Sequence, residues 1–158
     1  MLGNGAGSLR QEAVEIRADV LCYTTDPLES DLEATGPVRL TLHVNSSASC
    51  TDFTGKLVDV FPDGSAWNVT DGIRRVQSVA SMQNSPMQVD IDLWPTSMLF
   101  KAGHRIRVEV SSSNYPRFDR NPNTGREIAT ETQPTVATQA IHHGRTAPSR
   151  LVLPVVPR

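Results

Sequence analysis

The stretch SSSNYPRFDRNPNTG, residues 111–125, concentrates side chains able to bind a partner or a ligand. It contains two arginines, two aromatic residues and an aspartate between asparagines and prolines. Long or aromatic side chains are costly to order, and a plain linker seldom carries so many. We therefore expect something to pack against this segment, and the partner need not belong to this chain.

One metal site can be read in the same segment. Asp119, Asn121 and Asn123 occupy alternate positions, as oxygen ligands do at the start of a calcium loop. The pattern then departs from that of a calcium loop, because Gly125 is the seventh residue instead of the sixth and the twelfth is not acidic. The alternative is a set of Asx turns that satisfy their own backbone.

The rest of the chain does not contain a recognisable catalytic set. No G-x-S-x-G nucleophile motif is present, and the histidines are scattered, with the adjacent His142 and His143 expected on opposite faces of a strand. Asp90 and Asp92 share a strand face, where exposed acids are the common case. Asp59 lies within an apolar run, so we expect a structural ion pair, with arginine the natural partner. We predict no catalytic residue, no cofactor and no metal beyond the calcium candidate.

Composition excludes some partners. The 158 residues carry a net charge of −2 and a pI near 6.1, which disfavours nucleic acid and anionic membranes. No run approaches the ~20 apolar residues of a membrane span, and no signal peptide is evident, so we expect a cytoplasmic protein. Cys22 and Cys50 are expected to be free thiols instead of a disulfide.

The elements that position these residues are mostly strands, since apolar and polar residues alternate along 38–44, 87–94 and 104–110. Further strands are predicted at 19–24, 56–61, 66–70, 73–80, 136–143 and 150–156, of which 56–61 and 150–156, apolar on both faces, should lie centrally. Turns are predicted at 61–65 (a hairpin), 71–72, 84–86 and 102–103. One helix is predicted at 8–17 with Ser8 as its cap.

About nine short strands with turns every eight to twelve residues predict an all-β fold, a two-sheet antiparallel β-sandwich of jelly-roll type similar to galactose-binding domains. Residues 1–18 are expected to form a flexible lead-in or linker remnant, and residues 19–158 a single domain.

Several blocks occur in an order that resembles a known family: DVLCY (19–23), TDFTGKLVDVFPDG (51–64), DGIRR (71–75), IDLWPTS (91–97), residues 102–125 and HHGRTAPSRLVLPVV (142–156). Together they resemble the C-terminal domain of the X-Pro dipeptidyl-peptidase and cocaine esterase (CocE/NonD) family of serine hydrolases. The resemblance covers roughly residues 19–157. It implies a jelly roll that packs on an α/β-hydrolase domain and a helical cap, both absent from this chain, and no catalytic residue can be carried over.

The resemblance implies a non-catalytic accessory role, with these residues expected at the inter-domain surface or the border of the cleft: Asn114, Tyr115, Arg117, Phe118, Asp119 and Arg120. Trp94, opposite the core face of its strand, is expected to be either a further inter-domain contact or a platform for a ligand. Alternatively, the charged side chains of the loop pair with one another and its aromatic residues cap the sandwich. A stand-alone carbohydrate- or ligand-binding module and a homo-oligomer are the other functional readings.

Overall fold

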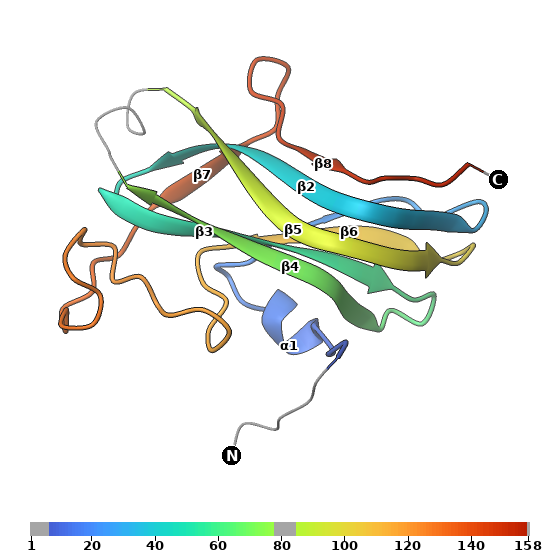
Figure 1. The fold of residues 1–158 in the computed structure, drawn as a ribbon, viewed down its shortest axis with the longest axis horizontal. Coiled ribbons are helices and arrows are strands. Elements are labelled where there is room, and N and C mark those ends of the chain that lie inside the picture. Colours follow the sequence, from blue (N-terminus) through green and yellow to red (C-terminus); the bar gives the residue numbers. More distant parts are fainter. Residues whose placement is uncertain (1–6, 78–84, 158) are drawn as a thin grey trace.

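The computed structural model describes residues 7–77 and 85–157, which form two antiparallel sheets stacked as a β-sandwich (Figure 1). Sheet A has the strand order β1 (Leu21–Thr24), β6 (Arg105–Ser111), β3 (Cys50–Val60), β4 (Ala66–Gln77). Sheet B has the order β5 (Met87–Phe100), β2 (Leu32–Ser46), β7 (Gln139–His142), with β8 (Arg150–Val152) also paired to β2. The predicted two-sheet sandwich is confirmed, whereas its finer likeness to galactose-binding domains stays a prediction.

The core lies between the sheets and is built by the predicted alternation. Along 38–44 of β2 and 89–93 of β5 every second side chain is apolar and buried, and sheet A faces them with its own apolar residues. The main contributors are Val38, Leu40, Leu42, Val44, Val89, Ile91 and Leu93 from sheet B, with Phe53, Leu57, Val108 and Val110 from sheet A. The predicted central place of 56–61 is confirmed, because β3 lies between β6 and β4.

The sandwich is closed along the side where β4 meets β5. The hydroxyl of Thr70 donates a hydrogen bond to the carbonyl of Leu93. Gly72 lies so close to β5 that an added Cβ would be 2.1 Å from the carbonyl oxygen of Asp92. Only glycine fits there. On the opposite side of the sandwich, β1 and β6 stand across from β7 and β8.

The turn predicted at Asp71-Gly72 is wrong for the same reason. Asp-Gly is a local turn signal, but here the chain continues through it as one strand, and the two strands predicted at 66–70 and 73–80 merge into β4. Residues 78–80 of that prediction, and residue 84 of the turn at 84–86, lie outside the described residues. The hairpin at 61–65 is confirmed, with Phe61 N–H donating to Ser65 O at 2.8 Å and Gly64 at φ +88°.

Two further predictions fail in detail. The helix is limited to α1 (Glu12–Glu15), and Gln11 precedes it, because the Ser8 hydroxyl donates to the Asn68 carbonyl instead of capping a helix. The segment 150–156 is not central: β8 has three residues, and Val152 and Val155 are exposed. Only one side of this segment faces the core, and on that side Leu151 and Leu153 pack against it.

Cys22 and Cys50 are free thiols, as predicted. Within the described ranges, no helix is both long and apolar enough to cross a membrane.

Candidate docking surface

The face of sheet A that points away from sheet B is polar and yet largely buried. Alternation along β3, β4 and β6 turns Asp52, Thr54, Lys56, Asp71 and Glu109 to this outer face while their neighbours fill the core. All of them except Lys56 are buried, because two segments cover them (Figure 1). One is the loop after β6, residues 112–125, and the other is the N-terminal segment that carries α1, residues 8–18.

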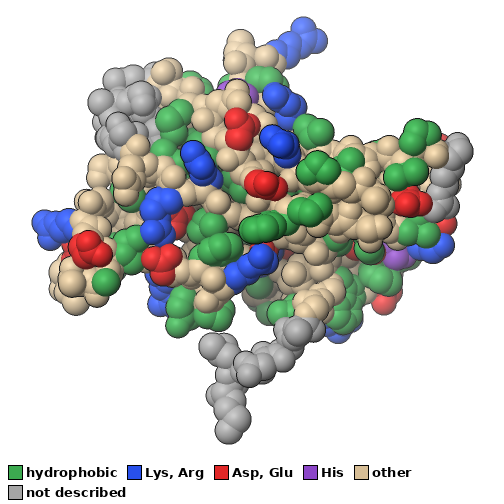
Figure 2. Space-filling model, viewed as in Figure 1, with side chains coloured by type: hydrophobic (Ala, Val, Ile, Leu, Met, Phe, Trp, Pro, Cys, Tyr) green, Lys and Arg blue, Asp and Glu red, His purple; other side chains and the backbone are tan. Residues whose placement is uncertain are grey.

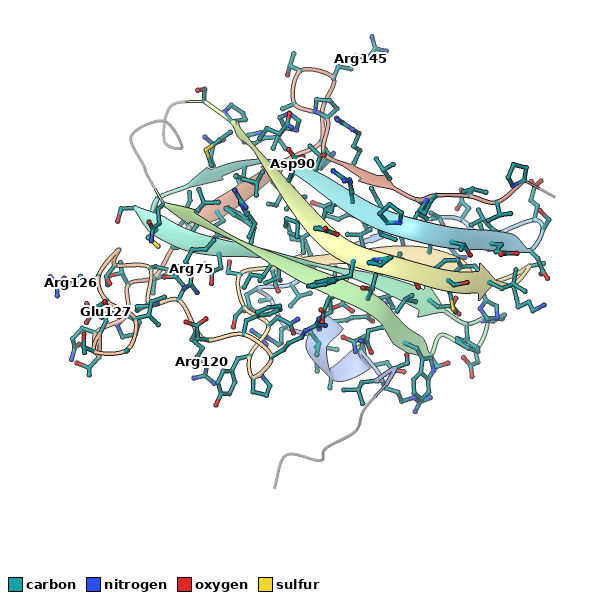
Figure 3. All side chains as sticks on the ribbon, in the orientation of Figure 1. Arg75, Asp90, Arg120, Arg126, Glu127 and Arg145 are labelled. Atoms are coloured by element: carbon teal, nitrogen blue, oxygen red, sulfur yellow. The ribbon has the colours of Figure 1, made fainter. Side chains whose placement is uncertain are left out.

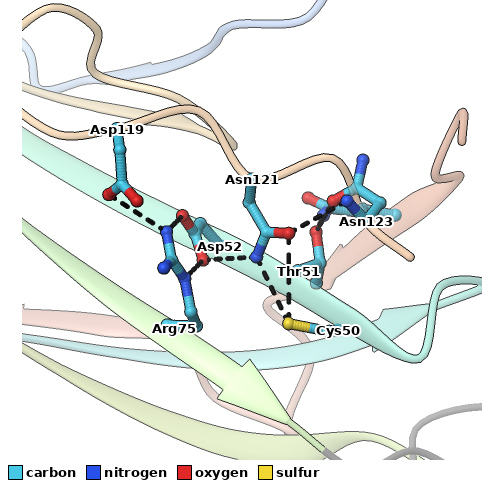
Figure 4. A network of polar contacts seen from close by, with 8 residues as sticks. Cys50, Thr51, Asp52, Arg75, Asp119, Asn121 and Asn123 are labelled. Carbon is cyan, nitrogen blue, oxygen red and sulfur yellow. Dashed lines mark hydrogen bonds and ion pairs between the residues drawn. The ribbon is translucent and has the colours of Figure 1, made fainter. Parts of the chain in front are cut away.

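The loop after β6 is fastened to β3 and β4 through a charged centre (Figure 4). Arg75 binds Asp52 through two hydrogen bonds of 2.8 Å and reaches Asp119 at 3.3 Å. Asn121 donates to the same Asp52 carboxylate at 2.8 Å. Asp52 is 1% exposed, so this carboxylate depends on Arg75 and Asn121 for the contacts it has lost to water. The hydrogen bond from Arg75 to Asp52 raises the pKa of Arg75, which keeps the guanidinium charged.

A second anchor lies further along β4. Asp71 accepts a hydrogen bond of 2.9 Å from the Asn114 side chain and pairs with Arg117. The loop also turns on itself, since the Asn123 backbone N–H donates to the Asn121 side chain at 2.9 Å. This is the Asx turn that was the alternative to a calcium site.

What the loop shows to solvent is an aromatic ring with a guanidinium stacked on it. Tyr115 is 55% exposed, and the Arg120 guanidinium lies 4.4 Å from its ring centroid. Arg117 lies over Phe118 in the same way, at 5.4 Å. Beside them is an open hollow of about 780 Å³. Its lining includes Arg120, Arg126 and Glu127, which are labelled in Figure 3. An arginine stacked on an exposed aromatic side chain is a common element of protein contact surfaces.

The N-terminal segment covers the other half of the outer face. Leu9 N–H binds the Asn68 side chain at 2.5 Å, and Gln11 N–H binds the Ala66 carbonyl at 2.9 Å, both on β4. Residues 8–18, expected as a lead-in, thus lie against sheet A. Residues 1–6 of that prediction are outside the described residues.

Under this segment is a group of buried charges. Glu15 pairs with Arg107 at 2.6 Å, and Lys56 is 3.7 Å from Glu109. Glu109 is 3% exposed, and one oxygen each of Glu15 and Glu109 lacks a hydrogen-bond partner. Burial raises the pKa of Glu109 to about 7, and the nearby Glu15 carboxylate is a further cause. The positive charge of Lys56 acts in the opposite direction and lowers this pKa.

Acidic and basic side chains are interspersed over the face seen in Figure 2, and neither sign forms a continuous patch there.

Comparison with known proteins identifies the family. Residues 7–152 match the family model described as the X-Pro dipeptidyl-peptidase C-terminal non-catalytic domain. This chain belongs to that family. It is 46% identical to the cocaine esterase of Rhodococcus sp. (strain MB1 Bresler) over 161 residues, which cover 96% of this chain and 28% of the esterase. A putative serine esterase of Mycobacterium bovis is 31% identical, over 88% of this chain and 24% of its own length.

Solved structures agree with this assignment. An α-amino acid ester hydrolase superposes with a TM-score of 0.85 at 31% identity, over 93% of this chain and 27% of its own. An aminopeptidase from a marine sediment archaeon superposes with a TM-score of 0.86 at 27% identity, over 94% of this chain and 27% of its own. This C-terminal domain therefore spans about a quarter of the length of the relatives that it matches.

In this C-terminal domain, the residues singled out from the sequence are largely brought together. Six of them lie on the loop over sheet A: Asn114, Tyr115, Arg117, Phe118, Asp119 and Arg120. Trp94 is not on this loop but on β5 in sheet B, 60% exposed, with its backbone at φ 68° and its N–H bound to Asp92 at 2.8 Å. Arg117 and Asp119 pair with Asp71 and Arg75 of β4 instead of with one another, whereas Arg120 stacks on Tyr115.

The three side chains of the calcium candidate have protein partners, and calcium binding stays a prediction. Asp119 turns to Arg75, Asn121 to Asp52 and Cys50, and Asn123 to Thr51. Among the described residues, no group of three or more histidines, cysteines or acids is placed to hold a metal ion.

The predicted partner of Asp59 is wrong. His104, and not an arginine, binds it, with Nδ1 at 2.9 and 3.1 Å from the two carboxylate oxygens. The predicted divergence of His142 and His143 is confirmed, since His142 binds Asn45 and His143 meets the ring of Tyr23.

Sequence reasoning missed the anchors Asp52 and Asp71. A signal for Asp52 existed, because the alternation through Asp52, Thr54 and Lys56 leads directly into the strand predicted at 56–61 and places three polar side chains on one face of β3. Asp71 was hidden by the Asp-Gly turn signal.

Proposed function

We propose that this chain is the C-terminal accessory domain of an α/β-hydrolase that acts on esters or X-Pro dipeptides, and that it packs on the catalytic and cap domains and borders their cleft. The observation that carries the proposal is the loop over sheet A. Its inward residues are fixed on buried acids, while Tyr115 and Arg120 are held outward as a stacked pair. A loop fixed in this way loses little conformational freedom when a partner docks.

The family match and the quarter-length coverage support this role, because in the relatives named above most of the chain lies outside the matched region. The purified chain is expected to show no turnover of p-nitrophenyl acyl esters or X-Pro anilides. Turnover that a serine-directed inhibitor abolishes would contradict the non-catalytic role.

Size-exclusion chromatography with light scattering tests docking directly. The chain is run alone and mixed with a family hydrolase-plus-cap fragment, and a one-to-one complex is expected. Tyr115→Ala and Arg120→Glu should weaken it at least tenfold, since exposed aromatic and arginine residues carry much of the energy of contact surfaces. Arg145→Glu, on the exposed loop between β7 and β8, is the matched control (Figure 3). A monomer that ignores the fragment would refute the docking role.

One observation favours a second function, a stand-alone carbohydrate-binding module. Trp94 is 60% exposed on a strand, and sugar rings stack on such surfaces. A glycan array probed with the chain and with Trp94→Ala tests this function, and binding that Trp94→Ala does not reduce would exclude Trp94 as the platform.

A further inference from the structure

The open side of the sandwich contains an apolar recess that the proposed docking role does not use. The closed side is sealed where Gly72 and Thr70 of β4 touch β5. Across the molecule, β1 and β6 of sheet A stand apart from β7 and β8 of sheet B, and between them lies a recess of about 310 Å³.

The walls of the recess are aliphatic. They are formed by core side chains from four strands: Leu40, Leu42, Val108, Val110, Ile141 and Leu151. Leu40 and Leu42 are almost fully buried, so the recess reaches the hydrophobic core itself. A space with such walls offers water few hydrogen bonds.

Three of the hydroxyl groups at the mouth, those of Thr24, Thr25 and Ser149, already form hydrogen bonds within the protein. Thr24 Oγ1 accepts from Arg107 at 2.7 Å, and Thr25 Oγ1 accepts from the backbone of Ile106 at 3.1 Å. The Ser149 hydroxyl accepts from His43 N–H at 2.8 Å and donates to the carbonyl of His142. These three hydroxyls already have hydrogen-bond partners, so a ligand needs no polar group to satisfy them.

Among the described residues that line the mouth, Arg150 is the one arginine or lysine. Its charge is among those that lower the pKa of Asp90, after the hydrogen bonds from Thr41 and Gln88. The Asp90 carboxylate, on the outer face of sheet B, is therefore already stabilised by the positive charge of Arg150.

Aromatic rings form part of the rim. Tyr23, which is 40% exposed, meets the ring of His143 edge to face at a centroid distance of 5.8 Å. Such a pair offers a ring edge and a ring face to a third aromatic group.

From these observations we propose that the recess is a binding site for a compact, neutral, bicyclic-sized aromatic molecule. An apolar cavity of about 150 Å³ is enough to hold benzene, and ligand pockets begin at roughly 300 Å³. The volume of the recess, about 310 Å³, is about twice that of the cavity that holds benzene and reaches the lower limit for ligand pockets. Neutral character follows from the aliphatic walls and the committed hydroxyls, and aromatic character from the rim.

Methyl-resolved NMR of the whole chain tests the site, with indole as the neutral probe and indole-3-carboxylate as its anionic counterpart. Indole is expected to shift the Leu, Val and Ile methyl signals of the recess saturably and to leave Val136, which is exposed elsewhere, unchanged. The carboxylate should bind at least tenfold more weakly, because its charge would lose hydration in the aliphatic interior. Equal affinity for both probes, or shifts spread over the whole molecule, would overturn the proposal.

Two variants connect the binding to the recess. Ile141→Trp, on the short strand β7, should fill the recess and lower indole affinity at least tenfold, whereas Val136→Trp makes the same kind of change outside it. Tyr23→Ala removes the aromatic rim with little disturbance of the core and should weaken indole several-fold, which keeps the proposal testable if Ile141→Trp fails to fold. Unchanged affinity in Tyr23→Ala and in a folded Ile141→Trp would refute it.

Discussion

Asp52 and Asp119 bind the same guanidinium, that of Arg75, from very different surroundings. Asp52 is almost fully buried and Asp119 is 63% exposed. Burial makes a charge depend on its protein partners, whereas water replaces the partner of an exposed charge at little cost. The loop is therefore held mainly from the side of Asp52.

This contrast predicts unequal losses of stability. Asp52→Ala should lower the free energy of unfolding by about 3 kcal/mol, because Arg75 and Asn121 both lose a buried partner. Asp119→Ala should lower it by less than about 1 kcal/mol. Urea unfolding followed by circular dichroism measures both, and equal losses would contradict the assigned anchor.

Glu109 predicts a pH dependence of stability. Its pKa rises from 4.5 to about 7 on folding, so between these values the folded protein holds a proton that the unfolded chain has released. The free energy of unfolding therefore falls as pH rises from about 4.5 to 7 and is flat in this respect above 7.

Glu109→Gln isolates this effect, because glutamine imitates the protonated carboxyl. The variant should match the parent chain near pH 5 and exceed its stability by about 2 kcal/mol at pH 8. Urea titrations at the two pH values measure the difference, with the exposed Glu127→Gln as control. A difference that does not change with pH would exclude Glu109 as the group responsible.

At the scale of elements, β4 shows where local sequence signals stop. The alternating pattern predicts β2, β5 and β6, because a strand with one buried face has apolar and polar residues in alternation along the sequence. Asp71-Gly72 has the local form of a turn, yet Gly72 is required by the approach of β5, which lies about twenty residues further along the chain. The same holds for Asp59, whose partner His104 is set by the pairing of β3 with β6 and not by its neighbours.

The docking loop was predictable as a segment but not in its contacts. Its unusual composition and its resemblance to a family segment identified residues 114–120. Which side chains turn inward depends on the positions of Asp52 and Asp71 in other strands, and no pattern within the loop contains that information.

The strand crossing at Gly72 makes a steric prediction. Gly72→Ala should destabilise the fold by about 3 kcal/mol or more, since the new Cβ would collide with a backbone carbonyl that cannot turn aside. Gly144→Ala, which meets nothing within 4 Å, should stay within about 0.5 kcal/mol of the parent chain. Thermal unfolding compares the two, and a tolerated Gly72→Ala would mean that β4 and β5 are not in contact.

At the scale of the whole molecule, the two segments that cover the outer face of sheet A lie where the proposed catalytic and cap domains would contact the sandwich. The N-terminal segment lies on β4 and β6, and the loop after β6 lies beside it over β3 and β4. On this account the outer face is the side through which the domain is attached, and its buried charges hold the two covering segments in place.

A full-length chimera tests this account most directly. The matched region of the Rhodococcus cocaine esterase would be replaced by this chain, and the temperature of half-inactivation of its esterase activity would be measured. The account predicts an active chimera in which Arg120→Glu lowers that temperature by about 3 °C or more, as expected for a lost contact of 1–2 kcal/mol, while Arg145→Glu leaves it unchanged. Equal temperatures for the two variants would contradict docking through the loop over sheet A.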